Sequence, residues 1–232
     1  VFDRTNTVWV GDVKYKDISG PDGVPDGVID DYDKTNIGSP MPKFTFGWTN
    51  TFRYKNFDLS VFINGSYGNK VYNYLSMKLT HMNSPWTNQL NAVNGRAQLV
   101  PINPNKVYED GTMWYNDVSN VMVANPGASI PRATINDPND NDRISDRYIE
   151  DGSYIRLKNI SLGYTFPKKT IDKLGLSNLR IYANIQNLLT ITGYDGYDPE
   201  IGASTSSVNV YGLDNGRYPS PTVYSFGLNV SF

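Results

Sequence analysis

The chain has 232 residues, no cysteine, and a formal net charge of -2 from 21 basic and 23 acidic side chains. The lack of cysteine excludes disulfides, thiolate catalysis and cysteine-based metal sites, and the balanced charge gives no basic surface for nucleic acid. Aromatic residues, Gly, Thr, Ser and Asn are frequent, which favours short strands joined by turns, so we predict an all-β protein.

Residues 1–42 are predicted to be a loop region, and their segment 22–33 partly matches the spacing of a calcium-binding loop. With Asp22 at position 1, carboxylates recur at positions 5, 9 and 12, a glycine falls at position 6 and a backbone carbonyl at position 7. Valine at position 3 and aspartate at position 12 depart from the pattern, and the alternative is a solvated loop with an Asp-Gly turn. Calcium is the candidate cofactor. Its candidate ligands are Asp22, Asp26, Val28 through its carbonyl, Asp30 and Asp33.

Residues 43–67 are predicted to form a transmembrane β-hairpin. From Phe44 to Tyr54 the even positions are mostly aromatic, and the odd positions are mostly small or polar. The alternation resumes after a tight turn at Lys55 and Asn56 and continues to Tyr67. Since successive side chains of a strand point to opposite faces, each strand has one apolar and one polar face.

Residues 68–152 are predicted to be one long extracellular loop that folds over or binds something, because such loops rarely lack structure of their own. His81 is the only histidine, which excludes a multi-histidine metal site. The Asn- and Asp-rich run 136–142 could attract a cation, although its side chains more often bond their own backbone.

Residues 153–232 are predicted to supply three further strands and the loop 191–221. Alternating runs end at Phe166, extend over 179–188, and close the chain over 222–232. Ile155 and Leu157 are out of phase with the apolar positions that follow them, so we expect a bulge or the end of the membrane band near Lys158 and Asn159.

The connections between these five strands alternate between short turns and long polar loops, as in outer-membrane barrels with their long loops outside. Aromatic residues in the long loops are candidates for contacts with a ligand or a partner protein. Their alternative role is to pack the loops onto themselves. The candidates are Trp86, Trp114, Tyr115, Tyr194, Tyr197 and Tyr211.

We expect no enzymatic activity and propose no catalytic residue. The chain lacks a Gly-x-Ser-x-Gly motif. Neighbouring carboxylates such as Asp195 and Asp198 lie beside glycine and proline, where acidic residues are usually solvated turn residues.

Five strands cannot close a membrane barrel, and open strand edges are not tolerated in lipid. We therefore expect the chain to be the C-terminal portion of a larger transmembrane barrel.

Several sequence blocks resemble the SusC/RagA-type TonB-dependent outer-membrane transporters of Bacteroidetes. The blocks occur in the family's order along nearly the whole chain. They are 38–44 (GSPMPKF), 146–167 (DRYIEDGSYIRLKNISLGYTFP), 179–190 (LRIYANIQNLLT), 196–200 (GYDPE) and 218–232.

The resemblance implies a 22-stranded antiparallel barrel in the bacterial outer membrane, of which this chain supplies about the last five strands. Such barrels import oligosaccharides or peptides with energy delivered through TonB, which acts on a part of the protein that is absent here. A SusD-type surface lipoprotein is the implied partner. The alternative is a soluble, secreted all-β module for carbohydrate binding or adhesion, which would stay monomeric without detergent.

Overall fold

The computed structural model describes residues 2–3, 8–201, 203–204 and 207–232. The chain divides into two compact units, which we describe separately. The loop unit contains Val1–Ile37 and Leu75–Tyr148, and the sheet unit contains Gly38–Tyr74 and Ile149–Phe232. The predicted loop region 1–42 is thus divided between the two units, and residues 1 and 4–7 of it lie outside the described residues. The same holds for residues 202 and 205–206 of the predicted loop 191–221.

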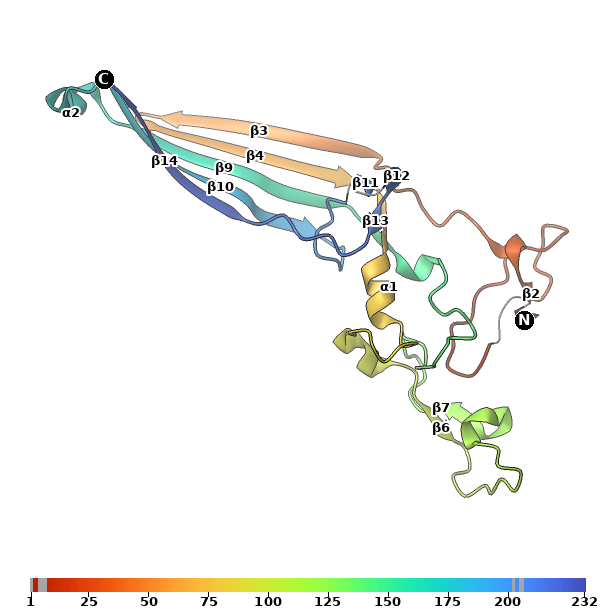
Figure 1. Ribbon diagram of the computed structural model, residues 1–232. Helices are drawn as coiled ribbons and strands as arrows, with labels where there is room; N and C mark the ends of the chain where they lie inside the picture. Colours follow the sequence, from red (N-terminus) through yellow and green to blue (C-terminus); the bar gives the residue numbers. More distant parts are fainter. Residues whose placement is uncertain (1, 4–7, 202, 205–206) are drawn as a thin grey trace. The chain divides into compact units, whose positions relative to one another are not determined.

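A five-stranded antiparallel sheet, in the order β14-β10-β9-β4-β3, makes up most of the sheet unit (Figure 1). Its strands are β3 (Phe44–Tyr54), β4 (Phe57–Tyr67), β9 (Tyr154–Thr165), β10 (Asn178–Thr192) and β14 (Val223–Ser231). The predicted all-β class and the five predicted strands are confirmed. The strand β10 runs four residues beyond the alternating run 179–188, to Thr192.

The two short connections of this sheet lie at the same end of it, opposite the end where the long segments begin (Figure 1). One is the turn at Lys55 and Asn56, where Lys55 has a φ of 52°. The other contains α2 (Lys168–Ile171) and η6 (Asp172–Leu174) and ends at a left-handed Gly175. The sheet therefore has a short-turn end and a long-loop end.

The strand β9 contains the predicted bulge. Ile63 of β4 pairs with Leu157, whereas the preceding residue of β4 pairs with Asn159, so Lys158 is an extra residue. An inserted residue reverses the alternation of a strand. It returns Leu157 and Ile155 to the face of the later apolar residues, which explains why the sequence pattern changes phase at this position.

Smaller sheets flank the long-loop end within the sheet unit. β5 (Lys70–Asn73) lies between β13 (Leu213–Asp214) and β8 (Ile149–Asp151), and β11 (Ala203–Ser204) pairs with β12 (Ser207–Tyr211). Among the described residues of the unit, the buried apolar side chains are Val71, Ile171 and Tyr194. In contrast, β3 and β14 are exposed along nearly their whole length, so no described residue of this unit covers these two strands as a second layer.

The loop unit has structure of its own, as expected for so long a segment. Its buried apolar residues include Met77, Val93, Ala97, Val121 and Ile130. Its strands are β1 (Phe2–Asp3), β2 (Val28–Ile29), β6 (Leu99–Pro101) and β7 (Val121–Val123). Its helices are η1 (Asp31–Asp33), α1 (Tyr74–Thr80, from its second residue), η2 (Asn91–Gly95), η3 (Trp114–Asn116), η4 (Val118–Asn120) and η5 (Asp146–Tyr148).

Among the described residues, every helix is too short or too polar to cross a lipid bilayer.

Candidate functional site

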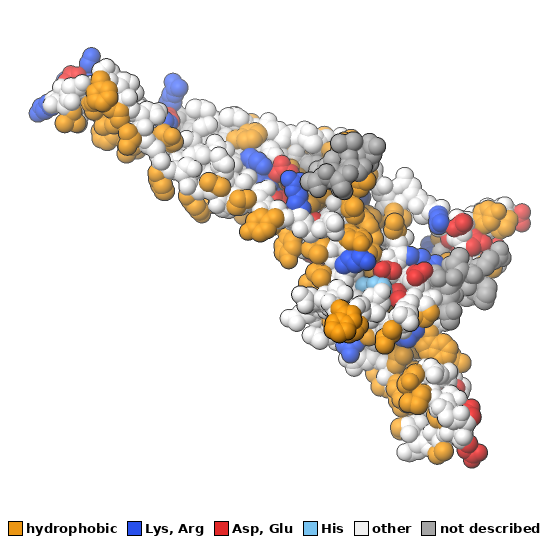
Figure 2. Space-filling model, viewed as in Figure 1, with side chains coloured by type: hydrophobic (Ala, Val, Ile, Leu, Met, Phe, Trp, Pro, Cys, Tyr) orange, Lys and Arg blue, Asp and Glu red, His pale blue; other side chains and the backbone are white. Residues whose placement is uncertain are grey.

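One face of the five-stranded sheet is apolar from edge to edge, because the apolar residues of neighbouring strands pair directly with one another. We call it the apolar face. One row of paired residues consists of Phe52, Leu59, Leu162, Ala183 and Phe226. The next row consists of Tyr54, Phe57, Tyr164, Ile181 and Leu228. Hydrophobic side chains lie along one side of the sheet in Figure 2, and Phe226 is 82% exposed. Soluble monomers rarely expose an apolar patch that continues across five strands.

Aromatic rings gather at both ends of the apolar face. At the short-turn end, the Phe57 ring lies 4.7 Å from that of Tyr164, which lies 5.0 Å from that of Phe166. At the long-loop end, the Phe44 ring lies 5.4 Å from that of Tyr67. Aromatic residues at both ends of an apolar band are typical of the girdles of outer-membrane barrels.

The opposite face of the sheet, the polar face, carries hydroxyl, amide and charged groups. One row consists of Thr51, Ser60, Ser161, Asn184 and Ser225. The Arg180 guanidinium of β10 donates to the two carboxylate oxygens of Asp58 on β4, across the intervening strand β9, at 2.6 and 3.0 Å. Arg180 crosses over Gly163, where a β-carbon would clash with the guanidinium. The absence of a side chain at Gly163 is therefore what leaves room for this ion pair.

A charged network lies where the polar face meets the loop 191–221. Arg156 of β9 is 2% exposed, and its guanidinium donates to Glu200 at 2.7 Å, to Thr190 at 2.8 Å and to Asp198. The Lys158 ammonium donates to the same Glu200 carboxylate oxygen at 2.9 Å. The bulge residue Lys158 and Arg156, two residues before it, thus bind two carboxylates of the loop between them.

Asp198 is ionised in this network. Burial opposes its ionisation, but the N–H groups of Ser220 and Glu200 and the Arg156 guanidinium outweigh burial and lower the pKa of Asp198 to about 2. The network joins two of the blocks that carry the family resemblance, 146–167 and 196–200. Reasoning from the sequence missed it and treated Asp198 as a solvated turn residue. The sequence does carry a signal for this network, namely two cations, Arg156 and Lys158, in a strand whose other residues are mostly apolar or small.

The three candidate aromatic residues of the sheet unit have different surroundings. Tyr194 is 5% exposed, and its hydroxyl donates to the buried Asp214 at 2.6 Å. Burial and this hydrogen bond raise the pKa of Tyr194. Tyr197 and Tyr211 are 65% and 53% exposed. Tyr194 therefore packs the loop 191–221, whereas the other two rings are free to contact a ligand or a partner.

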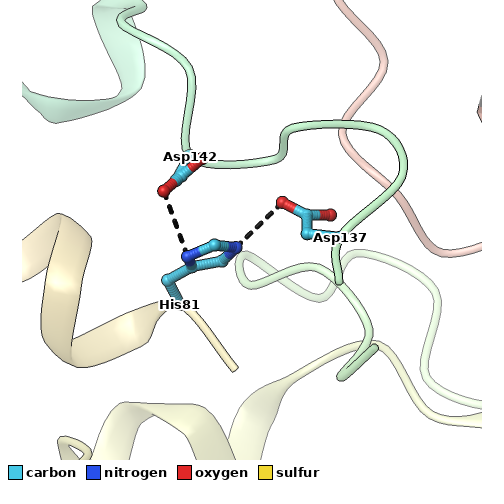
Figure 3. A group of neighbouring side chains, drawn as sticks. All are labelled: His81, Asp137 and Asp142. Atoms are coloured by element: carbon cyan, nitrogen blue, oxygen red, sulfur yellow. Dashed lines mark hydrogen bonds and ion pairs between the residues drawn. The ribbon is translucent and has the colours of Figure 1, made fainter. Parts of the chain in front are cut away.

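In the loop unit, His81 lies between two carboxylates (Figure 3). Its Nε2 lies 2.8 Å from Asp137, and its Nδ1 lies 3.1 Å from Asp142. His81 is 9% exposed and Asp137 is 4% exposed. Potential metal ligands are the side chains of His, Cys, Asp and Glu. Within the described part of the chain, His81, Asp137 and Asp142 are the only three such residues whose ligand atoms all lie within 4.8 Å of one another.

The arrangement of His81 does not suit a single metal ion. The two carboxylates approach opposite ring nitrogens, so one metal ion on either nitrogen would leave the other carboxylate outside its coordination shell (Figure 3). Each carboxylate instead lies within hydrogen-bond distance of its own ring nitrogen, so the imidazole bridges the two. Asp137 also accepts from the Asn141 amide at 2.6 Å, so the run 136–142 bonds both to itself and to a distant residue.

The predicted calcium loop lies in the loop unit, where its carboxylates accept hydrogen bonds from the backbone. Asp33 accepts from the N–H groups of Ile18, Ser19 and Asp30, and these bonds lower its pKa. Asp30 caps η1 through the N–H of Tyr32.

Among the described residues, no three of the predicted carboxylates lie within ligand distance of one another. Asp26 accepts from the N–H of Val28, and Asp22 is exposed. One oxygen of the neighbouring Asp17 is buried without a hydrogen-bond partner, while its other oxygen accepts from Gly27 at 2.7 Å. The calcium site stays a prediction.

The remaining candidate aromatic residues belong to the loop unit. Trp86 is 92% exposed. Trp114 and Tyr115 contact each other edge to face at 5.7 Å, and the Tyr115 carbonyl accepts from the Trp9 indole at 3.2 Å. The structure thus places Trp114 and Tyr115 in contact with each other. The role of all three rings in binding a ligand or a partner stays a prediction.

No family model matches the sequence. TonB-dependent receptor P3 of Formosa agariphila is 36% identical over 211 residues, which are 89% of this chain and 18% of that protein. TonB-dependent receptor P26 of the same organism is 33% identical over 231 residues, 96% of this chain and 20% of that protein. TonB-dependent receptor SusC of Bacteroides thetaiotaomicron is 29% identical over 209 residues, 89% of this chain and 17% of that protein. The chain spans about a fifth of the length of these relatives.

Two solved structures share the fold. The structure of the RagAB peptide transporter has a TM-score of 0.59 at 20% identity, over 84% of this chain and 18% of the matched chain. The RagAB peptide importer in its open-open state has a TM-score of 0.58 at 20% identity, over 93% of this chain and 20% of the matched chain. At this identity the likeness shows the fold alone, which is that of part of a RagAB transporter chain.

Proposed function

From its homology to about a fifth of the length of TonB-dependent receptors such as SusC, we propose that this chain forms part of the wall of an outer-membrane import barrel. The homology confirms the resemblance that the sequence blocks indicate. The relatives are named as receptors, and we likewise propose no catalytic residue for this chain. The imported ligands would be oligosaccharides or peptides.

The observation that carries this proposal is the apolar face together with the polar face behind it. A tilted strand of roughly 9–11 residues crosses the core of a bilayer. The five strands have 11, 11, 12, 15 and 9 residues, so each is long enough to cross. The apolar face would contact lipid, and the polar face would line the interior of the barrel.

The edges of the sheet support a larger barrel. Within the described residues, β3 and β14 each pair with one long strand and leave their other edge free. Free backbone groups are not tolerated in lipid, so further strands of the protein would pair with both edges. We propose a 22-stranded barrel in which this chain forms the C-terminal strands.

The partners in this proposal are a SusD-type lipoprotein at the long-loop end and TonB, which acts on a part of the protein outside this chain. The long-loop end presents exposed aromatic rings, including Tyr197 and Tyr211 of the sheet unit. Exposed aromatic residues are frequent in protein interfaces, which supports contact with a partner lipoprotein on this side.

The test uses spin labels at two adjacent residues of β9 in the full-length protein, embedded in lipid. The chain has no cysteine, so Leu162→Cys and Ser161→Cys each add one labelling position to this segment. Oxygen is concentrated in lipid, and a nickel chelate is confined to water. We expect the label at 162 to be relaxed mainly by oxygen, and the label at 161 mainly by the nickel chelate. Equal responses at the two positions would contradict the proposal.

The same measurement tests the alternative, a soluble carbohydrate-binding or adhesion module. In such a module the apolar face would be buried against a second layer, so the label at 162 would be shielded from both reagents. The protein would also remain in solution without detergent. Relaxation by oxygen at 162 in a detergent-requiring protein therefore excludes the module.

For the acidic loop we propose calcium binding, supported by the spacing of its carboxylates and by the unpartnered oxygen of Asp17. A hard cation with oxygen ligands would neutralise several carboxylates at once. The ion would rigidify the loop and take no part in transport chemistry. Calorimetric titration of the purified protein with calcium tests this, and no heat at millimolar concentration would contradict it.

A further inference from the structure

A cavity of about 460 Å³ lies in the sheet unit beside the polar face, at the long-loop end. Thr45 pairs with Ser66, and Ser66 pairs with Tyr154, so these three residues form one row of the polar face and one wall of the cavity. Described residues of the loop 191–221 also line the cavity. The remaining lining residues are Pro40, Pro42, Asn69, Lys158, Pro199, Glu200, Ile201, Arg217 and Ser220.

The charges that line this cavity do not balance. Lys158 and Arg217 are cationic, and Glu200 is the only anionic residue among the lining residues. Glu200 already accepts from Arg156 at 2.7 Å and from Lys158 at 2.9 Å. Arg217 is exposed, and no described carboxylate forms an ion pair with its guanidinium. The cavity therefore contains one positive charge that no described residue neutralises.

The other lining residues favour a peptide over a sugar. Rings that stack on sugars need an open aromatic face, and Tyr154 is the only aromatic residue of the lining. The Arg156 guanidinium lies 5.5 Å from the centre of that ring and already occupies a face of it. Prolines and Ile201 supply apolar contacts, while the hydroxyl and amide groups of the polar face suit the N–H and C=O groups of a backbone.

We infer that this cavity binds the carboxylate end of a short peptide, with Arg217 as its anchor and Lys158 as a second cation. A guanidinium presents two parallel N–H groups that match a carboxylate, which gives both affinity and orientation. The inference rests on the proposed function, because the polar face lines a water-filled interior only in a barrel. It deepens that function by selecting peptides from the two proposed ligand classes.

The experiment measures binding of three probes to the full-length protein, purified in detergent, by isothermal titration calorimetry. The probes are trialanine, trialanine with an amidated C-terminus, and maltotriose. The variant is Arg217→Gln, and the matched control is Lys173→Gln, which removes an exposed cation of η6 at the short-turn end. We expect trialanine to bind the native protein, and amidation or Arg217→Gln to weaken binding about tenfold or more. The control should bind as the native protein does.

Three results would overturn the inference: trialanine and its amide binding equally, Arg217→Gln binding trialanine as tightly as the native protein, or maltotriose binding while trialanine does not. Arg217 is exposed, so its replacement should leave the fold intact, and the amidated probe tests the same contact without any mutation. Binding in detergent needs neither TonB nor a membrane. A failure here therefore differs from a failure of the import proposal, which the spin-label measurement tests.

Discussion

Replacement of Arg156 by methionine should loosen the loop 191–221 without disturbing the sheet. The Arg156 side chain is 3% exposed and binds two loop carboxylates, those of Asp198 and Glu200, from a position on β9. Methionine can fill much of the same volume, but it cannot donate a hydrogen bond. The Asp198 side chain, itself 6% exposed, would then be left with backbone N–H groups as its only described donors.

The expected cost follows from this burial. Removing one partner of a buried ion pair costs about 3–5 kcal/mol, because the remaining charge stays desolvated. At about 1.4 kcal/mol for each factor of ten, local opening of the loop should become about 10²- to 4 × 10³-fold more frequent. An exposed ion pair would change the opening by less than about a factor of ten.

Hydrogen exchange of the full-length protein in detergent measures this opening. Peptides that cover 210–221 should exchange faster in Arg156→Met, whereas peptides of β4 should be unchanged. Arg53→Met is the matched control, since Arg53 is an exposed residue of β3 on the same polar face. If both variants changed exchange of the loop equally, the network would have no special role in holding it.

The same network gives the loop a dependence on pH. The pKa of Asp198 falls from its ordinary value of 3.8 to about 2 in the folded protein. A lowered pKa contributes stability that is present above pH 4 and is lost as the pH falls through 2, here roughly 2–3 kcal/mol. The opening of the loop, taken as its exchange rate divided by the intrinsic rate at each pH, should therefore increase between pH 4 and pH 2, and Asp198→Asn should remove most of that increase.

Three further outcomes are expected from the structure. Gly163→Ala should lower the melting temperature, by a cost of about 1–3 kcal/mol, because its β-carbon would meet the Arg180 guanidinium, whereas Gly193→Ala, with open space around it, should not. His81→Ala should destabilise the loop unit by about 2–4 kcal/mol and expose it to limited proteolysis, whereas Trp86→Ala, at a 92% exposed position, should not. Calcium at millimolar concentration should slow proteolysis within 17–33, and equal cleavage with and without calcium would remove the proposed metal site.

The strands were predictable because their signal is local. Side chains alternate with a period of two, so each of the five strands can be recognised from its own residues. Even the bulge at Lys158 left such a signal, because Ile155 and Leu157 change phase relative to Ile160 within a few positions. The pairing of the strands then follows from aligning their apolar faces, since a slip by one residue would turn a strand over.

The charged network was not predictable in the same way, because its partners are far apart in sequence. Arg156 and Asp198 are 42 residues apart, and no periodicity connects them. The sequence shows only that a strand carries two cations and that a later segment carries two carboxylates. Knowing which cation meets which carboxylate requires the course of the loop 191–221, which depends in turn on the contact of Tyr194 with Asp214.

The loop unit shows why turn chemistry alone is an incomplete guide to acidic segments. The run 136–142 bonds its own backbone, as Asn and Asp in turns usually do, with Asp137 accepting from the Asn141 N–H. Yet Asp137 also receives a hydrogen bond from His81, 56 residues earlier, and is thereby buried. A solvated turn and a buried turn use the same local bonds. What distinguishes them is a hydrogen-bonding partner from elsewhere in the chain, because a carboxylate is seldom buried unless it is paired.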